Sequence, residues 1–542
     1  MSERLVERVS DVQRFAFAPR EPVRSATGVV ASSQRGASEV GAAVLRNGGT
    51  AADACVAMDA MLHVTEPTST GLGGDMFALH FEARTGRVTA LNGSGRAPLG
   101  RTFADVARDE RGQIPQLHGD AVTVPGVCAG WFDLIARHGT MPISELLVPA
   151  IETAESGFEV GPITAAAWER NLGQLRSREL TLDGRAPRAG EVFRNPGLAR
   201  VLERIAVNGR SAFYEGPVAD AIASAARRYG SALTADDLAR HESTWEDPIA
   251  VAYRGVRVWE CPPNGQGLAA LLALAILEEL PVHPAGSVER AHLQIEALRL
   301  GFADARWYVA DRGVSPAPLQ ALLSRTYASE RRRLIDPYLA AARVEHGVPA
   351  SIPGTVYFCA VDAAGNACSY VSSTYLGFGT GIVPEGLGFS LQNRGRGFSL
   401  DAGHPNVFAP GKRPYHTIIS GMLTRDDSSL LGPFGVMGGV MQPQGHVQVV
   451  TALVDDVADP QEALDRLRFF IEPEIDGGRV YLESGTSPTV ADGLRARGHD
   501  IVVNPQTHGR TMFGRGQIIV RQSDGSLAAG SDQRADGCAL AC

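Results

Sequence analysis

An apolar residue occupies every second position over residues 355–361, beginning with Val356. A period of two predicts a β-strand. Residues 362–366 read DAAGN, which is the composition of a tight turn, and a second strand is predicted to follow as far as Thr374. The pattern therefore predicts a β-hairpin whose first strand begins at Thr355.

Strand-like and helix-like segments alternate along the rest of the chain. Terminal signals support the helices, such as NGG directly after residue 46 and Thr50 directly before residue 51. Mixed strands and amphipathic helices indicate an α/β protein built in layers. Strands are predicted at 28–33, 76–81, 88–92 and 255–260, and helices at 37–46, 51–62, 198–207, 218–228, 268–280 and 289–306.

The start of the predicted hairpin offers a specific chemistry. If the Gly354–Thr355 bond breaks, Thr355 carries a hydroxyl and a free α-amine on one residue. An α-amine titrates near pH 7.7 to 8.0, so its neutral form can act as the base for the hydroxyl. Gly354 lacks a side chain, which eases attack on the bond, and the polar stretch 340–353 predicts a surface loop before it. The alternative is that Thr355 simply begins an ordinary strand.

Longer motifs add to this pattern. They read GTVYFCAVDAAGNACSYVSSTYLGFGTGIV, QNRGRGFS, PGKRPYHT and MGGVMQPQGH, and, upstream, VVASSQRGASEVGAAVLRNGGTAADACVA and VTEPTSTGLGGDMFALHF. From about Gly28 to its end the sequence resembles the γ-glutamyltransferase family of N-terminal-nucleophile hydrolases. The resemblance implies a four-layer αββα sandwich with two central, mostly antiparallel sheets. It also implies a proenzyme whose large subunit, 1–354, and small subunit, 355–542, remain one folded unit after self-cleavage.

The same resemblance assigns three supporting groups to the Thr355 nucleophile. The family's supporting hydroxyl falls on Ser373, and the backbone N–H groups that bind the oxyanion fall on Gly438 and Gly439. Each position also has a structural interpretation. Ser373 could be a strand serine on a solvent-facing side, and the glycine pair could be a plain strand-to-helix turn.

The positions that recognise glutamate in the family are changed in this chain. The family's carboxylate-binding arginine falls on a serine, with Arg96 two residues away. We expect the altered pocket to bind substrate through Arg96, Tyr375, Arg394, His416 and Thr417. The changed positions carry Ser94, Tyr375, Gly397, His416 and Thr417.

Two further departures concern the pocket. Arg394 and Arg396 are gained, and an arginine fork suits a carboxylate, although surface arginines are usually only solvated. Residues 406–408 run almost directly into the KRP element at 412–414, where lidded relatives carry an insert. The sequence is therefore similar to the lidless branch of the family, which includes small-amide hydrolases. An open site is expected to favour hydrolysis over transfer.

These features predict a self-processing amidohydrolase or acyltransferase that cleaves a small γ-glutamyl-like or other carboxylate-bearing amide. One alternative is an oxalyl C–C hydrolase on the same scaffold, and another is an inactive relative retained for binding. A nucleotide-dependent enzyme is a third possibility, suggested by the glycine loop at 71–75, which lacks the Walker lysine. The chemistry of the predicted hydrolase needs neither a metal nor an organic cofactor.

Composition restricts the partners. The 542 residues are 44% hydrophobic, enough for a large core, and the formal net charge of −9 comes without a basic run that would suggest nucleic acid. Residues 1–20 lack the apolar core of an export signal, and no apolar run is long enough to span a membrane. The protein is therefore predicted to be cytoplasmic, with small molecules as substrates and its oligomeric state open.

Metal binding is not predicted. The seven cysteines are scattered without metal-ligand spacing and are expected to be reduced. His292 and Glu296 lie four residues apart on a predicted helix, but no third ligand follows at a suitable spacing. We interpret them as an ordinary pair on a helix surface.

Overall fold

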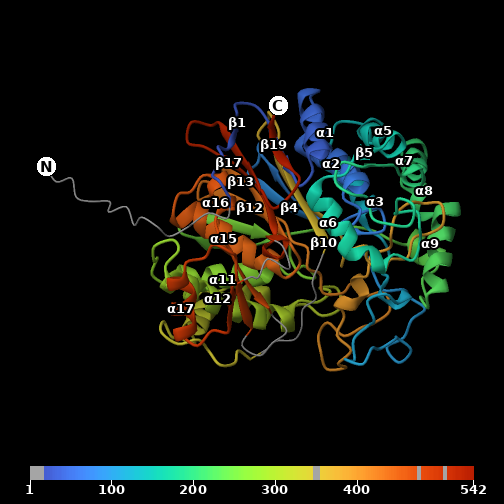
Figure 1. The fold of residues 1–542 in the computed structure, drawn as a ribbon. Coiled ribbons are helices and arrows are strands. Elements are labelled where there is room, and N and C mark those ends of the chain that lie inside the picture. The colour runs from blue at the N-terminus through green and yellow to red at the C-terminus, as the bar shows by residue number, and fades with distance from the viewer. Residues whose placement is uncertain (1–16, 346–353, 473–477, 504–509) are drawn as a thin grey trace.

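The computed structural model describes residues 17–345, 354–472, 478–503 and 510–542. Two antiparallel seven-stranded sheets form the centre of the protein (Figure 1). The first, sheet A, has the order β19 (Cys538–Ala541), β2 (Val29–Ser32), β10 (Gly354–Val361), β11 (Ala367–Tyr375), β3 (Asp75–Glu82), β4 (Arg87–Gly93) and β7 (Thr244–Glu246). The second, sheet B, has the order β1 (Val23–Ser25), β18 (Leu527–Ser531), β17 (Arg515–Arg521), β13 (Leu430–Met437), β12 (Gly421–Arg425), β9 (Val256–Glu260) and β8 (Ile249–Tyr253).

The two sheets face each other, and helices cover both outer faces. Strands β10 and β11 contact β13 and β17 across the interface, while α1 (Arg35–Arg46), α2 (Ala51–Thr65) and α3 (Val127–His138) cover sheet A. Helices α11 (Gly267–Glu278), α15 (Met441–Asp455) and α16 (Pro460–Asp465) cover sheet B, and α12 (Val288–Tyr308) packs on α11. This is the four-layer αββα arrangement that the sequence predicted, because each sheet buries both of its faces.

Smaller elements surround this centre. Strands β5 (Phe158–Glu159) and β6 (Val192–Phe193) pair, and β14 (Phe469–Glu472), β15 (Arg479–Leu482) and β16 (Ile501–Val503) form a third sheet. The remaining α-helices are α4 (Ile143–Leu146), α5 (Val148–Ser156), α6 (Pro162–Asn171), α7 (Pro196–Asn208), α8 (Ser211–Tyr214), α9 (Gly216–Arg228), α10 (Ala235–Ala239), α13 (Leu319–Leu322), α14 (Arg325–Arg332) and α17 (Pro488–Ala496). Short 3₁₀ turns occur at Gly119–Ala121, Leu172–Gln174, Arg394–Gly397 and Arg510–Phe513.

The predicted elements are confirmed, with small shifts at their ends. Helix α1 begins two residues before the predicted start, and α2 runs three residues beyond its predicted end. Thr50 caps α2 as expected, because its side chain accepts the N–H of Asp53, whose carboxylate accepts the N–H of Thr50. Residues 1–16 and residues 346–353 of the predicted surface loop lie outside the described residues.

The interpretation of His292 and Glu296 as a surface pair is wrong. Both are buried on α12, and they bond to other groups. His292 Nδ1 lies 2.8 Å from His499 Nε2, and a Glu296 carboxylate oxygen lies 2.5 Å from Arg299. The spacing correctly placed them on one helix, but that helix is covered by neighbouring segments. No cluster of three or more potential metal ligands occurs in the part of the chain that the structure describes.

Each central sheet combines strands from before and after residue 354. In sheet A, β10 pairs with β2 and with β11, which in turn pairs with β3. In sheet B, β12 pairs with β9, and β18 pairs with β1. The segments 1–354 and 355–542 therefore share both sheets, and each of the two large buried apolar clusters contains residues from both segments.

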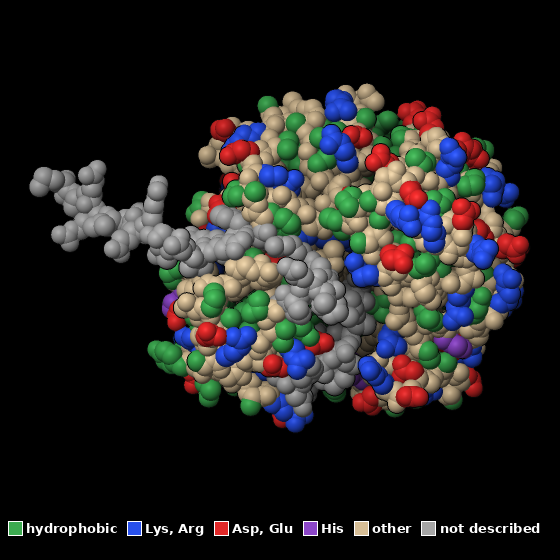
Figure 2. Space-filling view, viewed as in Figure 1, with side chains coloured by type: hydrophobic (Ala, Val, Ile, Leu, Met, Phe, Trp, Pro, Cys, Tyr) green, Lys and Arg blue, Asp and Glu red, His purple; other side chains and the backbone are tan. Residues whose placement is uncertain are grey.

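The surface and the thiols give few further indications. Figure 2 shows basic and acidic side chains interspersed over the visible face. All seven cysteines are free, and five of them are buried. Among the described residues, no helix has both the length and the apolar character needed to cross a bilayer.

Candidate active site

Thr355 lies at a distortion of the β10–β11 hairpin. Gly354 pairs with Tyr375 and Val356 with Ser372, so two residues of β11 face Thr355 alone. Such bulges re-aim side chains and are frequent beside active sites. Tyr375, at the end of the distortion, has a φ of 81°, a left-handed conformation that is strained for a residue with a large side chain.

The bulge brings two hydroxyl groups together. Thr355 Oγ1 lies 3.2 Å from Ser373 Oγ, and Ser373 Oγ accepts the backbone N–H of Tyr375 at 2.8 Å. Thr355 is 1% exposed and Ser373 is fully buried. The alternative of a solvent-facing strand serine is therefore wrong, because β11 is buried between the helical layer and sheet B.

Arg394 extends this hydroxyl pair. Its Nη1 donates to Thr417 Oγ1 at 2.8 Å, and its Nη2 lies 3.4 Å from Ser373 Oγ. The guanidinium carbon stands 4.0 Å from the centre of the Tyr375 ring, a cation–π contact. Burial lowers the pKa of Arg394 to about 10, and Asp75 opposes that shift through space.

A buried guanidinium is normally paired with an anion. Among the described residues no carboxylate forms an ion pair with Arg394, and its Nε has no hydrogen-bond partner there. The nearby Arg396 differs, because it bonds to the Asp109 carboxylate, the Gln113 side chain and the Ile114 carbonyl. Arg394 is therefore able to receive an anionic group beside Thr355, whereas Arg396 is already engaged.

The glycine pair lies on the turn from β13 to α15. Gly438 and Gly439 have φ values of 133° and 57°, which explains the need for glycine at both positions. In the described structure no acceptor takes the N–H of either residue. Gln266 connects this turn to the arginine, because its Nε2 donates to the carbonyls of Gly439 and Thr417, each at 2.6 Å.

His416 contacts Asp75 on the strand next to Ser373. The two side chains are fully buried, and His416 Nε2 is 3.0 Å from Asp75 Oδ2. Asp75 sits on β3 directly opposite Ser373. Burial raises the pKa of Asp75 to about 7, against the lowering effect of Arg394, and burial keeps the pKa of His416 well below its ordinary value. Both shifts favour the uncharged forms.

This raised pKa makes stability depend on pH. Between about pH 4 and 7 the folded protein binds a proton at Asp75 that the unfolded chain releases, so stability falls as the pH rises through that window. One such proton contributes a slope of up to about 1.4 kcal/mol per pH unit. We expect Asp75→Asn to remove this negative contribution, so that the slope of melting temperature against pH between pH 5 and 7 is more positive in the variant than in its parent.

The comparison is made in chains that also carry Thr355→Ala, a background in which the predicted self-cleavage cannot occur. Asp427→Asn is the control, because Asp427 is an exposed turn carboxylate whose lowered pKa keeps it ionised throughout the range. If melting temperature changes with pH in the same way in the Asp75 and Asp427 variants, the raised pKa of Asp75 is contradicted.

Arg96 forms no hydrogen bond or ion pair with Thr355, Ser373 or Arg394 among the described residues. Its Nη1 bonds to Asp311 at 3.1 Å and to the Gly411 carbonyl at 3.2 Å. Ser94 is buried and donates to Asn92 at 2.7 Å. The structure thus joins four of the predicted residues to Thr355, directly or through one another: Ser373, Tyr375, Arg394 and Thr417.

The glycine loop at 71–75 packs against this cluster. A Cβ on Gly74 would collide with the carbonyl of Ser373, and one on Gly73 with the carbonyl of Ser390. Gly73 also accepts the N–H of Gln392 at 2.9 Å. Close packing of backbones thus accounts for these glycines without a phosphate.

Several buried residues near Thr355 were not predicted. Glu66 and Asp75 lie within the motif VTEPTSTGLGGDMFALHF, but no chemical role was predicted for either of them, and Arg515 lies far from that motif in the sequence. Gln266 lies in the PPNGQG turn, which the sequence marked only as rigid. Its position between prolines and glycines was the one signal available.

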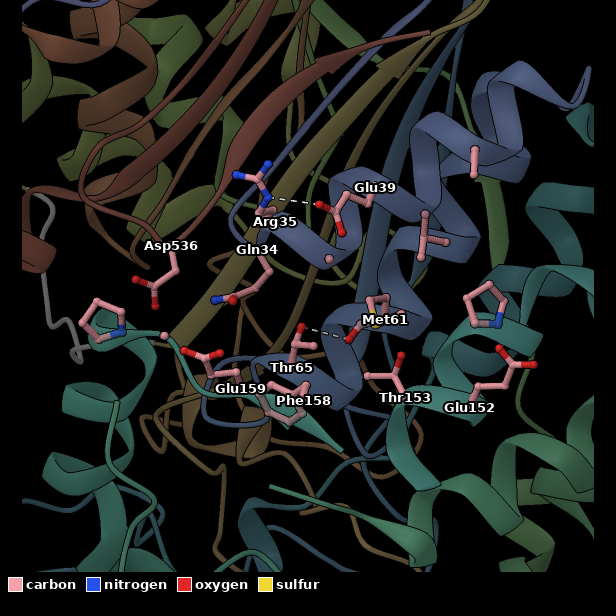
Figure 3. A pocket seen from close by; sticks show the side chains of 16 residues that line it. Gln34, Arg35, Glu39, Met61, Thr65, Glu152, Thr153, Phe158, Glu159 and Asp536 are labelled. Atoms are coloured by element: carbon pink, nitrogen blue, oxygen red, sulfur yellow. Dashed lines mark hydrogen bonds and ion pairs between the residues drawn. The ribbon is translucent and has the colours of Figure 1, made fainter. Parts of the chain in front are cut away.

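A separate cavity of about 730 Å³ lies among α1, α2, α5 and the start of α6 (Figure 3). Gln34, Thr65 and Asp536 line it, together with the Arg35–Glu39 ion pair. Gln34 also donates to Glu66 at 3.1 Å, on the side toward the Thr355 cluster. None of the predicted site residues lines this cavity.

A family model described as gamma-glutamyltranspeptidase matches residues 37–542. The chain belongs to the γ-glutamyltranspeptidase family. Members of this family are N-terminal-nucleophile hydrolases, and the chain is therefore a hydrolase of that type.

Relatives of this γ-glutamyltranspeptidase-family chain cover nearly its whole length. The glutathione hydrolase-like YwrD proenzyme of Bacillus subtilis (strain 168) is 35% identical over 93% of this chain and 96% of the relative. The oxamate amidohydrolase proenzyme of Klebsiella pneumoniae is 32% identical over 95% and 98%. The crystal structure of cephalosporin acylase from Bacillus halodurans matches with a TM-score of 0.89, 40% identity, and coverage of 98% and 99%.

Proposed function

We propose that the protein is a self-processing hydrolase that cleaves small amides bearing a carboxylate. The observation that carries this proposal is the buried Arg394 guanidinium beside the Thr355–Ser373 hydroxyl pair. The curated relatives support self-processing, since the two described above are proenzymes.

Processing would cut the Gly354–Thr355 bond and create a new chain end. The Thr355 α-amine, neutral near its pKa, takes the proton from Oγ1 as that oxygen attacks the substrate carbonyl. Ser373 Oγ, at 3.2 Å, holds the hydroxyl in place. The same amine passes the proton to the leaving nitrogen, and water then hydrolyses the ester formed on Thr355.

The tetrahedral intermediate of each step carries a negative oxygen. The N–H groups of Gly438 and Gly439 are the proposed donors, because they take no described acceptor and lie at the beginning of α15. A helix N-terminus favours negative charge, and preorganised amides are worth most where water is excluded.

The substrate carboxylate would bind Arg394, with Thr417 as a second donor and the Tyr375 ring beside the guanidinium. The family resemblance places the aspartate that holds the α-amine of a γ-glutamyl substrate at Gly397, so that amine would lack an acidic partner in this chain. A Cβ at Gly397 would collide with the carbonyl of Tyr415, so no larger residue fits there without rearrangement. The proposed substrate is therefore a small anionic amide rather than a γ-glutamyl compound.

A substrate panel tests this specificity. We expect kcat/KM for γ-glutamyl-p-nitroanilide to be at least about tenfold below that for the best short anionic amide, such as oxamate, because the lost amine contact is worth more than 1.4 kcal/mol. Wild-type protein is first checked by denaturing mass analysis for the fragments 1–354 and 355–542. Comparable rates on the γ-glutamyl donor and on the short amides would reject the substrate assignment while leaving the nucleophile intact.

A further inference from the structure

A buried ion pair joins the two proposed fragments next to Thr355. Glu66, just after α2, is 1% exposed, and its Oε1 lies 2.8 Å from Arg515 Nη1. Its other oxygen accepts Ser33 Oγ at 2.7 Å and Gln34 Nε2 at 3.1 Å. The carboxylate is therefore fixed on both sides.

Arg515 contacts both halves of the proposed catalytic machinery. Its backbone pairs with Met437 on β13, the residue directly before Gly438. Its Nη2 lies 3.4 Å from the carbonyl oxygen of Thr355. One side chain thus spans from the strand that carries the glycine turn to the residue that carries the hydroxyl.

We propose that Arg515 is a positioning residue for the Thr355 nucleophile and that Glu66 holds Arg515 in place from the other fragment. The inference rests on the proposed function. Once the Gly354–Thr355 bond is cut, Thr355 begins a chain, and chain ends fray unless other contacts hold them. The Arg515 contact restrains the new end from its carbonyl side, while Ser373 restrains it from its hydroxyl.

The position of the nucleophile relative to the oxyanion donors affects the rate of the chemical step more than it affects substrate binding. A misplacement of about 1 Å between a nucleophile and its oxyanion donors can cost about a hundredfold in rate. Within the described structure, the side chain of Arg515 forms hydrogen bonds or an ion pair with Glu66, Ser69 and Thr355, and with none of the predicted substrate-binding residues. Its loss should therefore lower kcat and leave KM nearly unchanged.

The pair also has an electrostatic signature. Glu66→Gln would leave the Arg515 charge uncompensated near the Thr355 α-amine, which disfavours the protonated amine. Arg515→Gln would leave a buried carboxylate instead, which favours the protonated amine. The acid limb of the kcat/KM profile should therefore move to lower pH in the first variant and to higher pH in the second, each by about half a pH unit or more.

The experiment uses processed wild type, Arg515→Gln, Arg515→Lys, Glu66→Gln and the control Arg331→Gln. Arg331 forms a comparably buried ion pair with Asp304 at 3.0 Å, away from Thr355. We expect kcat to fall at least tenfold in Arg515→Gln, to recover partly in Arg515→Lys, and to stay within twofold in Arg331→Gln. If Arg515→Gln has a wild-type melting transition but is cleaved more slowly than Arg331→Gln, the delay supports the positioning role, because the proposed cleavage uses the same hydroxyl.

A purely structural pair would give a different result. Lower melting temperatures with kcat and the acid limb unchanged in Arg515→Gln and Glu66→Gln would overturn the inference, while processed, active wild type would leave the proposed function standing. If wild type itself is neither cut nor active, the proposed function fails and the positioning role fails with it. Misfolding of Arg515→Gln leaves Arg515→Lys and Glu66→Gln to decide, through the KM-against-kcat split and the direction of the pH shift.

Discussion

Replacing Thr355 by alanine is expected to leave the chain in one piece and to abolish turnover. The substitution removes the hydroxyl that lies 3.2 Å from Ser373, so neither the Gly354–Thr355 bond nor a substrate has an attacking oxygen. Removing a nucleophile that works with its own base typically costs at least about a thousandfold in rate. Denaturing mass analysis should show a single species of 57.4 kDa for the variant.

Two matched variants separate the chemistry from the fold. Thr355→Ser retains both the hydroxyl and the amine after cleavage, so it should still process and turn over. Ser373→Ala retains the nucleophile but removes its hydroxyl partner, so cleavage should slow without stopping. An alanine variant at position 355 that still yields fragments ending at Gly354, or that keeps wild-type activity, would refute the proposed nucleophile.

Replacing Arg394 by glutamine should reduce kcat/KM on a short anionic amide by about a hundredfold. A buried, charge-assisted contact of this kind is commonly worth 2 to 5 kcal/mol, and the effect should appear mainly in KM. Arg394→Lys should restore little, because an ammonium group cannot reproduce the planar fork that reaches Thr417 and Ser373. The measurement is steady-state kinetics on processed protein.

The neutral methyl ester of the same amide isolates the charge contribution. Its kcat/KM should change less than about threefold in Arg394→Gln, since no carboxylate is present to bind. Arg396→Gln is the matched control, because this neighbour bonds to Asp109 and should leave both substrates unaffected. An equal loss on the anionic and neutral substrates would show that Arg394 acts through Ser373 rather than by binding the carboxylate.

The hairpin was predictable because its signal is local. The turn at residues 362–366 and the flanking apolar positions place β10 and β11 within a residue of their observed ends. The burial of both faces of β10 was harder to predict. Tyr357 and Cys359, between the apolar positions, are as buried as those positions, since β10 lies between α2 and sheet B. A strand in the middle of four layers needs apolar side chains on both faces.

The site was predictable only where the chain itself brings residues together. Thr355 and Ser373 lie on neighbouring strands of one hairpin, so their contact follows from the turn between them. Glu66 and Asp75 lie in a motif that carries the family resemblance, but the motif does not show that Glu66 pairs with Arg515 or that Asp75 lies opposite Ser373. Those contacts depend on how strands and helices from distant segments pack. The sequence identified Arg394 as a candidate for binding a carboxylate. It did not indicate that Arg394 is buried, because a segment of alternating glycine and arginine is typical of solvent-exposed loops.

The helical pair His292–Glu296 shows the same limit. Four-residue spacing correctly indicates one side of a helix. It does not indicate what covers that side, which here includes His499 and the Asp336 carbonyl from distant segments. Spacing defines a local geometry, and burial is decided by the rest of the fold.

Because each sheet mixes strands from both segments, the proposed cleavage before Thr355 would make unfolding hard to reverse. A single precursor chain folds in a unimolecular reaction, whereas a denatured mature enzyme would have to reassemble two interleaved pieces from dilute solution. The working lifetime of the processed protein should therefore depend on how slowly it unfolds rather than on how readily it refolds. Recovery of activity after denaturation should be high for the uncut precursor once it is allowed to cleave, and low and concentration-dependent for the mature pair.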